Sequence, residues 1–203
     1  RSPSVGTIIN GMNYNPVEIA KIYNNSKATC LSVLTEESYF KGNMIHIRMI
    51  KEEGIKLPIL CKDFFVHKWQ LYLAKSEGAD AILIILAGVG KKLANELYEE
   101  ALKLNLSVIV EVHTIEEAEY ALRFKDALMG INNRNLKTLK TDINTTYDIN
   151  NALRNYSGLM ICESGIKTKE QLIEINFKTK IKTFLIGESL LKNLHKNSIF
   201  SVL

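Results

Sequence analysis

Short apolar runs rich in β-branched residues recur along the chain at intervals of about 20–30 residues, the length of one βα unit. An ordinary parallel strand is apolar throughout, because helices cover both of its faces, and these runs are mainly apolar. We expect seven strands, which begin near Ala28, Pro58, Asp80, Leu106, Ala127, Gly158 and Lys182.

Between the runs, apolar residues return every three or four positions, which predicts amphipathic helices. Thr114 and Thr168 stand at N-cap positions, Glu117 is placed to close a capping box, and Gly78 lies just past a helix end. Strict alternation of strand and helix specifies a parallel sheet with right-handed crossovers. We expect helices over residues 16–25, 44–52, 66–78, 91–105, 114–124 and 168–175.

A doubly wound sheet and a (β/α)8 barrel both satisfy this alternation. The nucleotide-binding GxGxxG of the doubly wound fold is absent, because Gly88-Val89-Gly90 lacks the third glycine and does not follow the first strand. We therefore predict one domain, residues 1–203, with the α/β fold of a (β/α)8 TIM barrel. The chain opens on Arg1 rather than Met, so we expect a fragment from which the first strand is missing.

Five of the apolar runs end in a polar residue or a glycine, unlike ordinary parallel strands. These residues are Lys62, Glu111, Asn132, Glu163 and Gly187. Barrel enzymes assemble their active sites at one rim, from the carboxyl-terminal ends of several strands. The repeated pattern therefore predicts a catalytic rim.

Lys62 and Glu111 are the two candidates for proton transfer. Lys62 follows an apolar stretch, residues 58–61, so we expect a half-buried ammonium with a lowered pKa, usable as a proton donor or an amine nucleophile. The alternative is a solvated lysine paired with Asp63. Alternation places Ile109 and Glu111 on one face of their strand, which favours Glu111 as an acid, a base or a partner of Lys62.

Glycine-containing loops, Glu163-Ser164-Gly165 and Gly187-Glu188-Ser189, follow the last two strands. In barrel enzymes these loops frequently bind phosphate through backbone N–H groups, and glycine lets the backbone approach the anion. Two such loops together favour a phosphate site over plain turns. Arg134 could pair bidentately with a carboxylate, although the polar run around it is usual for a solvated loop.

Composition narrows the class of partner. The chain is 46% hydrophobic and 24% charged, with a net charge of +4, and its basic residues are scattered. This argues against nucleic acid and weakly favours an anionic small molecule. The longest apolar stretch, AILIILAGVG, is too short to span a bilayer.

The remaining reactive or aromatic side chains suggest no further site. The histidines lack the spacing of metal ligands, so no metal is expected. Trp69 is expected to pack within the fold rather than stack on a ligand. Cys30, Cys61 and Cys162 form no CxxC pair, and we expect each to be a buried thiol of a cytoplasmic protein.

Through nearly its whole length the chain resembles the indole-3-glycerol-phosphate synthase family. The matching elements, in order, are RSPS at 1–4, SVLTEESYF at 32–40, KDF at 62–64, EVH at 111–113, GINNR at 130–134, ESGI at 163–166 and FLIGE at 184–188. The resemblance implies a (β/α)8 lyase of tryptophan biosynthesis that needs no cofactor or metal. Its substrate would be 1-(2-carboxyphenylamino)-1-deoxyribulose 5-phosphate, which loses carbon dioxide and water to give indole-3-glycerol phosphate.

The resemblance also implies roles for the rim residues. Lys62 would be the general acid at the ribulose carbonyl oxygen, and Glu111 would assist dehydration as a base or as a partner of the lysine. Asn132, Glu163 and Ser164 would complete the polar floor of the site.

Substrate contacts follow from the same resemblance. Arg134 would face the anthranilate carboxylate, and Phe40 and Phe64 would wall the aromatic ring. The phosphate would be held by Ser2, Gly165 and Gly187, with Glu188 in the same loop as Gly187. A fused or associated enzyme of the tryptophan pathway is a further expected partner.

The family carries a Glu and a Lys on its first strand, and neither precedes Arg1 here. We therefore expect residues 1–203 alone to show little turnover, and added N-terminal residues to restore it. Two alternatives stay open: another phosphosugar barrel enzyme, either an isomerase or a Schiff-base aldolase using Lys62, and a non-catalytic remnant that binds a phosphorylated ligand.

Overall fold

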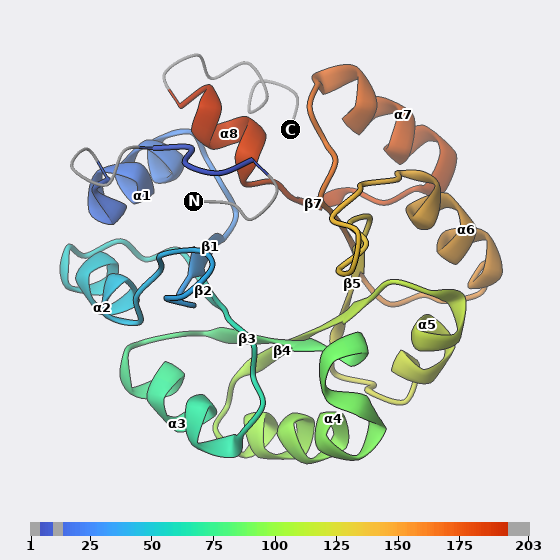
Figure 1. The fold of residues 1–203 in the computed structure, drawn as a ribbon, viewed down its shortest axis with the longest axis horizontal. Coiled ribbons are helices and arrows are strands. Elements are labelled where there is room, and N and C mark those ends of the chain that lie inside the picture. Colours follow the sequence, from blue (N-terminus) through green and yellow to red (C-terminus); the bar gives the residue numbers. More distant parts are fainter. Residues whose placement is uncertain (1–4, 10–13, 195–203) are drawn as a thin grey trace.

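A computed structural model describes residues 5–9 and 14–194 of the chain (Figure 1). Seven strands form one parallel sheet in the order in which they occur along the chain. A doubly wound sheet reverses its strand order at a switch point, whereas this order runs in one direction throughout. The strands are β1 (Leu31–Leu34), β2 (Ile59–Lys62), β3 (Ala81–Ile85), β4 (Ser107–Val112), β5 (Leu128–Asn132), β6 (Met160–Glu163) and β7 (Thr183–Leu185).

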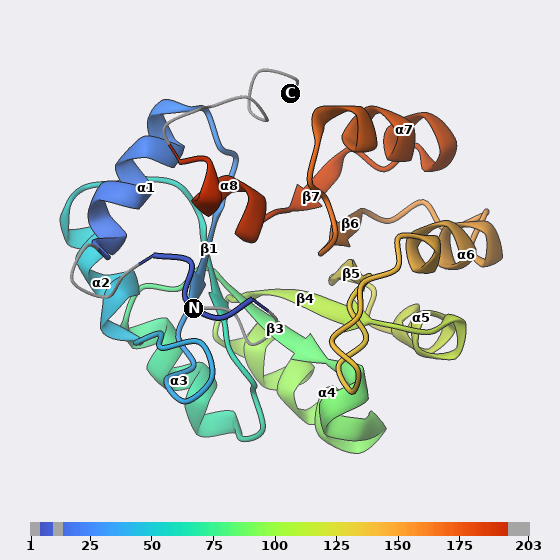
Figure 2. The same ribbon diagram turned by 45° about the horizontal axis from the view of Figure 1, so that its top comes forward.

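The helices surround the strands as an outer ring (Figure 1). They are α1 (Pro16–Asn25), α2 (Ile45–Glu52), α3 (Lys68–Ser76), α4 (Leu86–Lys103), α5 (Ile115–Ala121), α6 (Asn144–Ala152), α7 (Lys169–Thr179) and α8 (Glu188–Lys192). Helix α8 lies between α1 and α7 in both ribbon views (Figure 1, Figure 2). The predicted (β/α)8 architecture is confirmed as a nearly closed barrel of seven strands, and among the described residues no ladder joins β7 to β1.

Alternation along the strands divides the apolar side chains between two cores. One face of each strand packs against the helices and forms the larger core. The other face fills the barrel interior with Leu60, Leu83, Ile85, Ile109 and Ile161. Side chains two positions apart in a strand share a face. The residues two positions after Leu60, Ile109 and Ile161 therefore also point inward. They are Lys62, Glu111 and Glu163.

Helix starts follow the local sequence signals. Thr168 caps α7 in a full capping box. Thr114 Oγ1 accepts the N–H of Glu117 at 3.2 Å, which confirms Thr114 as the cap of α5. The Glu117 carboxylate, however, accepts the N–H of His113 at 2.7 Å rather than that of Thr114. The predicted capping box is thus displaced by one residue, and it ties α5 to the end of β4.

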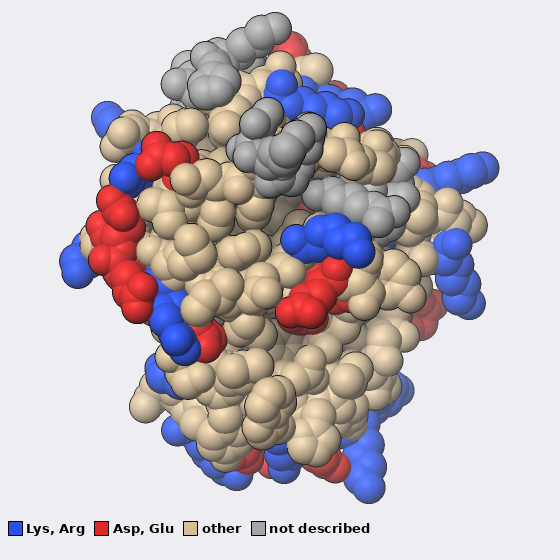
Figure 3. All heavy atoms as spheres, turned by 60° about the vertical axis from the view of Figure 1, so that its left-hand side comes forward, with Lys and Arg blue, Asp and Glu red and all other residues tan. Residues whose placement is uncertain are grey.

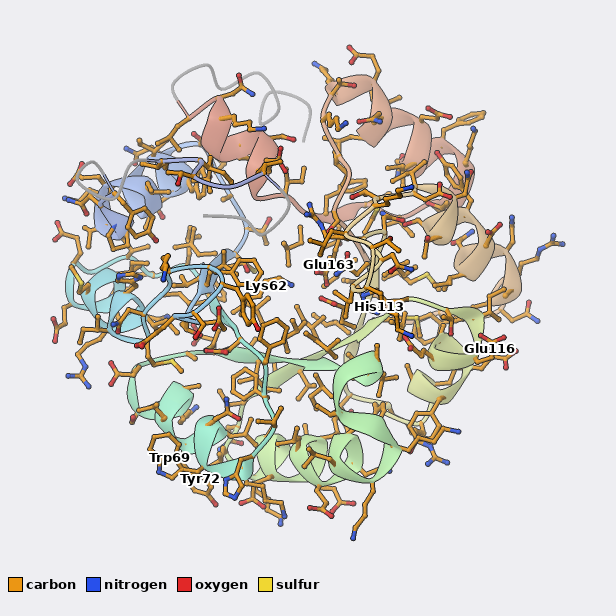
Figure 4. All side chains as sticks on the ribbon, in the orientation of Figure 1. Lys62, Trp69, Tyr72, His113, Glu116 and Glu163 are labelled. Atoms are coloured by element: carbon orange, nitrogen blue, oxygen red, sulfur yellow. The ribbon has the colours of Figure 1, made fainter. Side chains whose placement is uncertain are left out.

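Several local features differ from the sequence-based expectations. Helices α6 and α8 are not predicted, and α6 buries only Thr146 and Ile149, too few apolar positions for a helical pattern. Trp69 is 61% exposed instead of packed, and points outward from α3 (Figure 4). Cys30 is exposed, whereas the other two cysteines are buried as expected.

Charged side chains of both signs are interspersed on the flank shown in Figure 3. Opposite charges form ion pairs in the first half of the chain. Lys21 lies 3.2 Å from Glu18 and 2.7 Å from Glu53. Lys51 lies 2.7 Å from Asp80. Such mixing differs from the single-sign basic surface typical of nucleic-acid binding. Within the part of the chain that the structure describes, no helix combines the length and apolarity needed to cross a membrane.

Candidate active site

Lys62, Glu111 and Glu163 meet inside the barrel from three different strands, and Figure 4 shows Lys62 and Glu163 there. Lys62 Nζ lies 3.0 Å from Glu163 Oε2 and 3.2 Å from Glu111 Oε2, so one ammonium bridges two carboxylates. The alternative pairing of Lys62 with Asp63 is wrong. Asp63 Oδ2 instead accepts the hydroxyl of Thr35 at 2.5 Å.

Asn132 fixes the orientation of Glu111. It ends β5 opposite Glu163 in the β5–β6 ladder, and its Nδ2 donates to Glu111 Oε1 at 2.9 Å. Its Oδ1 accepts the N–H of Arg134 at 3.0 Å. Since both ends of the amide have a partner, its orientation is determined. Glu111 therefore has Lys62 on one oxygen and Asn132 on the other.

The charges around Lys62 decide its protonation. Burial alone would lower the pKa of Lys62, but the carboxylates of Glu163 and Glu111 outweigh burial and raise that pKa above its ordinary value. The expectation of a lowered lysine pKa is therefore wrong. Its two partners lie 49 and 101 positions away in the sequence, where no local pattern indicates them. Lys62 is an ammonium rather than a neutral amine.

The two carboxyl groups are pushed in opposite directions. For Glu163, burial and repulsion from Glu111 outweigh the attraction of Lys62 and raise the pKa to about 7. For Glu111, burial is outweighed by Lys62, by the hydrogen bond from Asn132 and by nearby His113, so its pKa lies below the ordinary value. Two carboxyl groups whose pKa values are separated in this way can serve as an acid and a base.

Gly130 provides the space that Glu163 occupies. It is paired with Glu111 in the β4–β5 ladder, and a side chain at this position would collide with Glu163 Oε1. Gly130 does not have a positive φ, so close approach rather than backbone conformation requires glycine here. Glu163 Oε1 is buried against Gly130 and has no hydrogen-bond partner within the described residues.

The loops after β6 and β7 lie together. Ser189 Oγ donates to the C=O of Ile166 at 2.6 Å. Gly165 has φ +84°, and Thr141, from the loop after β5, fills the space where a side chain at 165 would lie. The space beside Gly187 is open. The two glycines predicted to hold phosphate therefore belong to adjacent loops, one tightly packed and one open.

Phe40 and Phe64 face each other in the loops after β1 and β2, with ring centroids 6.4 Å apart. Phe64 is 42% exposed, which is unusual for a large apolar side chain beside a charged cluster. The Glu36 carboxylate accepts the N–H groups of Ser38, Tyr39 and Phe40 at 2.7, 2.7 and 3.1 Å. This one side chain fixes the loop that carries Phe40.

The other predicted contacts lie around the same rim. Arg134 Nη2 lies 4.0 Å from Glu188 Oε2, and Glu188 Oε1 lies 2.6 Å from Lys192 Nζ. Ser164 is half-buried, with φ +65°. Ser2 lies outside the described residues. No group of three or more His, Cys, Asp and Glu side chains in the described ranges is arranged to hold a metal ion.

Comparison with known families decides the assignment. Residues 1–201 match the family described as indole-3-glycerol phosphate synthase. The chain belongs to the indole-3-glycerol phosphate synthase family. The synthase of Aquifex aeolicus is 42% identical over 193 residues, which cover 95% of this chain and 73% of that protein. The synthase of Magnetococcus marinus is 43% identical over 193 residues, 94% of this chain and 70% of that protein. As a member of this family, the chain is a carboxy-lyase of tryptophan biosynthesis.

Other relatives differ in length or in sequence. The tryptophan biosynthesis protein TrpCF of Buchnera aphidicola (subsp. Schizaphis graminum) is 40% identical over 198 residues, and the match covers 97% of this chain but 42% of that protein. Thiamine phosphate pyrophosphorylase from Pyrococcus furiosus superposes with a TM-score of 0.67 at 15% identity, over 94% of this chain and 89% of that one. At that identity the likeness shows the fold alone.

Asn133 is a residue of this synthase that sequence reasoning missed. Its Nδ2 donates to the C=O groups of Glu163 and Ser164 at 3.0 and 3.2 Å. Its Oδ1 accepts the N–H and the hydroxyl of Thr146 at 3.1 and 2.8 Å. Asn133 is buried, although it belongs to a polar run that is typical of a solvated loop. Its position directly after the last residue of β5 was the one available signal.

Proposed function

We propose that the cluster of Lys62, Glu111 and Glu163 converts 1-(2-carboxyphenylamino)-1-deoxyribulose 5-phosphate into indole-3-glycerol phosphate. One observation carries the proposal: an ammonium lies between two buried carboxyl groups at the catalytic rim of the barrel. The relatives named indole-3-glycerol phosphate synthase support the choice of substrate.

Ring closure uses Lys62 as the acid. The aromatic carbon that bears the carboxylate attacks the ketone carbon, and the carbonyl oxygen takes a proton from the Lys62 ammonium. Loss of carbon dioxide then returns the electron pair of the broken C–C bond to the ring. Glu163, with its pKa raised to about 7, holds a proton near neutral pH and can return it to Lys62 across the 3.0 Å contact.

Dehydration uses Glu111 as the base. The hydroxyl on the former ketone carbon leaves as water with a proton from Lys62, and Glu111 removes a proton from the neighbouring ring carbon. The pair of that C–H bond becomes the new double bond. The lowered pKa of Glu111 keeps it ionised for this task. No step passes electrons to another molecule, so the mechanism uses side chains alone.

The aromatic end of the substrate would lie between Phe40 and Phe64, whose rings supply an apolar wall. Holding the ring against the ketone in a reactive pose is a large part of such catalysis. Arg134 would pair with the anthranilate carboxylate. Because Arg134 lies 4.0 Å from Glu188, substrate and Glu188 would compete for the same guanidinium.

The phosphate would bind in the loops after β6 and β7, through the backbone N–H groups around Gly165 and Gly187, together with Ser2. The hydrogen bond from Ser189 to the backbone of Ile166 supports one joint site, since it holds the two loops side by side. A carboxylate repels a phosphate, so Glu188 would contribute its backbone N–H rather than its side chain.

The rival functions fit this cluster less well. A Schiff-base aldolase needs a neutral lysine amine, whereas the two carboxylates keep Lys62 protonated. A non-catalytic binder has no use for three charged groups taken out of water, because burial of charge is costly. The family comparisons favour the synthase over an isomerase of the same pathway.

Replacing Lys62 by Ala tests the proposal. We expect turnover, followed by the fluorescence of the indole product, to fall by about 10²–10⁴-fold, while substrate binding measured by calorimetry persists. Lys103→Ala removes an exposed lysine of α4 and should change neither quantity. Near-normal turnover of the Lys62 variant, or a borohydride-trapped imine on Lys62, would contradict the assignment.

We also propose that residues 1–203 form a single domain with a fused or associated tryptophan-pathway enzyme as partner. The one-sheet topology supports the first point, and the TrpCF relatives support the second. A cytoplasmic location is supported by the buried, unpaired thiols of Cys61 and Cys162. Co-purification and fractionation would test these points.

A further inference from the structure

His113 is a partly buried titratable group that the proposed mechanism does not use. It follows β4 directly, two positions after Glu111, and therefore lies on the same face of the strand. Its Nε2 lies 3.4 Å from Glu111 Oε1, and its Nδ1 lies 3.6 Å from Glu117 Oε2. Both ring nitrogens are buried, and each lies within 4 Å of one carboxylate, so a protonated ring would be attracted to both.

Glu117 is held firmly on the outer side of the ring. Its Oε2 accepts the backbone N–H of His113 at 2.7 Å, and its own N–H is bonded to the Thr114 cap. The four groups Lys62, Glu111, His113 and Glu117 form a row of alternating charge when the imidazole is protonated. The row runs from the barrel interior, where the Glu111 side chain is 1% exposed, to the start of α5, where that of Glu117 is 24% exposed.

We propose that His113 is a positioning residue: lying between Glu111 and Glu117, its ring, when protonated, stabilises the ionised carboxylate of Glu111 and holds it in place. The inference rests on the proposed role of Glu111 as the base. The charged groups that face this row are Glu111 from β4, Glu117 from α5, Lys62 from β2 on the far oxygen of Glu111, and Glu163 from β6, which pairs with Lys62 and repels Glu111. An opposite charge at this range favours the ionised carboxylate.

The sign of the effect follows from this arrangement. Glu111 has cations on both sides, Lys62 and His113, and both lower its pKa. Replacing His113 by a neutral side chain removes one of them, so Glu111 should take up its proton at a higher pH. A purely structural histidine would change stability or the amplitude of turnover without moving the ionisation of Glu111.

His113→Gln is the decisive variant, because the amide nitrogen of Gln can take the place of Nε2 without a charge. We expect the midpoint of the Glu111 titration, followed by carboxyl ¹³C NMR, to rise by about one pH unit. The acid limb of the kcat–pH profile should rise with it, and KM should change little. Glu117→Gln keeps an oxygen that can accept the His113 N–H but removes an anion that repels Glu111, so it should shift the Glu111 midpoint slightly downward, opposite to His113→Gln.

Glu116→Gln is the matched control, since Glu116 is exposed on the same first turn of α5 and points away from the cluster (Figure 4). Glu116→Gln should move neither the midpoint of the Glu111 titration nor the acid limb of the kcat–pH profile. If neither the carboxyl titration nor the acid limb moves in His113→Gln, the inference is overturned. The NMR titration does not depend on turnover, whereas full turnover of Glu111→Gln would overturn the proposed function itself, so the two failures are distinguishable.

Discussion

Two layers inside the barrel come from the same strands, two residues apart, and have opposite characters. The lower layer includes Ile109 and Ile161, which pack against other apolar side chains. The upper layer includes Glu111 and Glu163, which are equally buried but charged or titratable. Apolar burial stabilises the fold without specific partners. Buried charges stabilise it only when paired, so the upper layer is expected to serve chemistry and the lower layer stability.

The largest effect expected from a change in the upper layer is a loss of turnover, which would sharpen the comparison of the two layers. Glu111→Gln keeps the shape of the upper layer and its contact with Asn132 but removes the base. We expect turnover to fall by about 10²–10⁴-fold, with a small change in the free energy of unfolding. Steady-state kinetics and urea unfolding would measure the two quantities. Glu119→Gln, at an exposed position of α5, should change neither. A variant at Glu111 that loses stability as its main effect would break the division between layers.

The lower layer should respond in the opposite way. Leu83 is 1% exposed on β3, a strand that carries none of the three charged groups. We expect Leu83→Ala to cost about 2–5 kcal/mol of the free energy of unfolding, because it leaves a cavity among the interior side chains. Turnover per folded molecule should change little. Leu102→Ala, at an exposed position of α4, provides the control for urea unfolding. A loss of kcat in Leu83→Ala as large as that of Glu111→Gln would contradict the comparison.

Strand periodicity made the division into layers predictable. A period of two residues places Ile109 and Glu111 on one face, and the structure puts both side chains inside the barrel. The order of the strands also followed from the alternation of strand and helix. The position of Lys62 at the end of β2 was predicted because the apolar run at 58–61 ends there in a charged residue.

The protonation states of the site residues were not predictable from the sequence. The direction of the Lys62 pKa shift depends on carboxylates from β4 and β6, which only the curvature of the folded sheet brings within 3.2 Å. Asn133 likewise finds its partners in Thr146 and in the backbone after β6. Helix α6, which supplies Thr146, has too few apolar positions to be recognised and depends on those contacts. Local patterns indicate which face a residue occupies, whereas pairings across strands decide its charge.

The smallest expected effect is on the pH dependence of the free energy of unfolding, and it shows whether the upper layer also limits stability. The pKa of Glu163 is about 7 in the folded protein against an ordinary value of 4.5, so between these values the folded state keeps a proton that the unfolded chain has released. The contribution of this bound proton to the free energy of unfolding is fully present below pH 4.5 and is lost as the pH rises through about 7. At about 1.4 kcal/mol per unit, this loss is at most about 3–4 kcal/mol. Glu163→Gln cannot titrate, so its free energy of unfolding, measured in urea at a series of pH values, should fall less steeply over this range. Glu170→Gln, at an exposed position of α7, should leave the slope unchanged. Parallel curves for Glu163→Gln and the unmodified protein would mean that Glu163 is ionised in the folded state and cannot return a proton to Lys62.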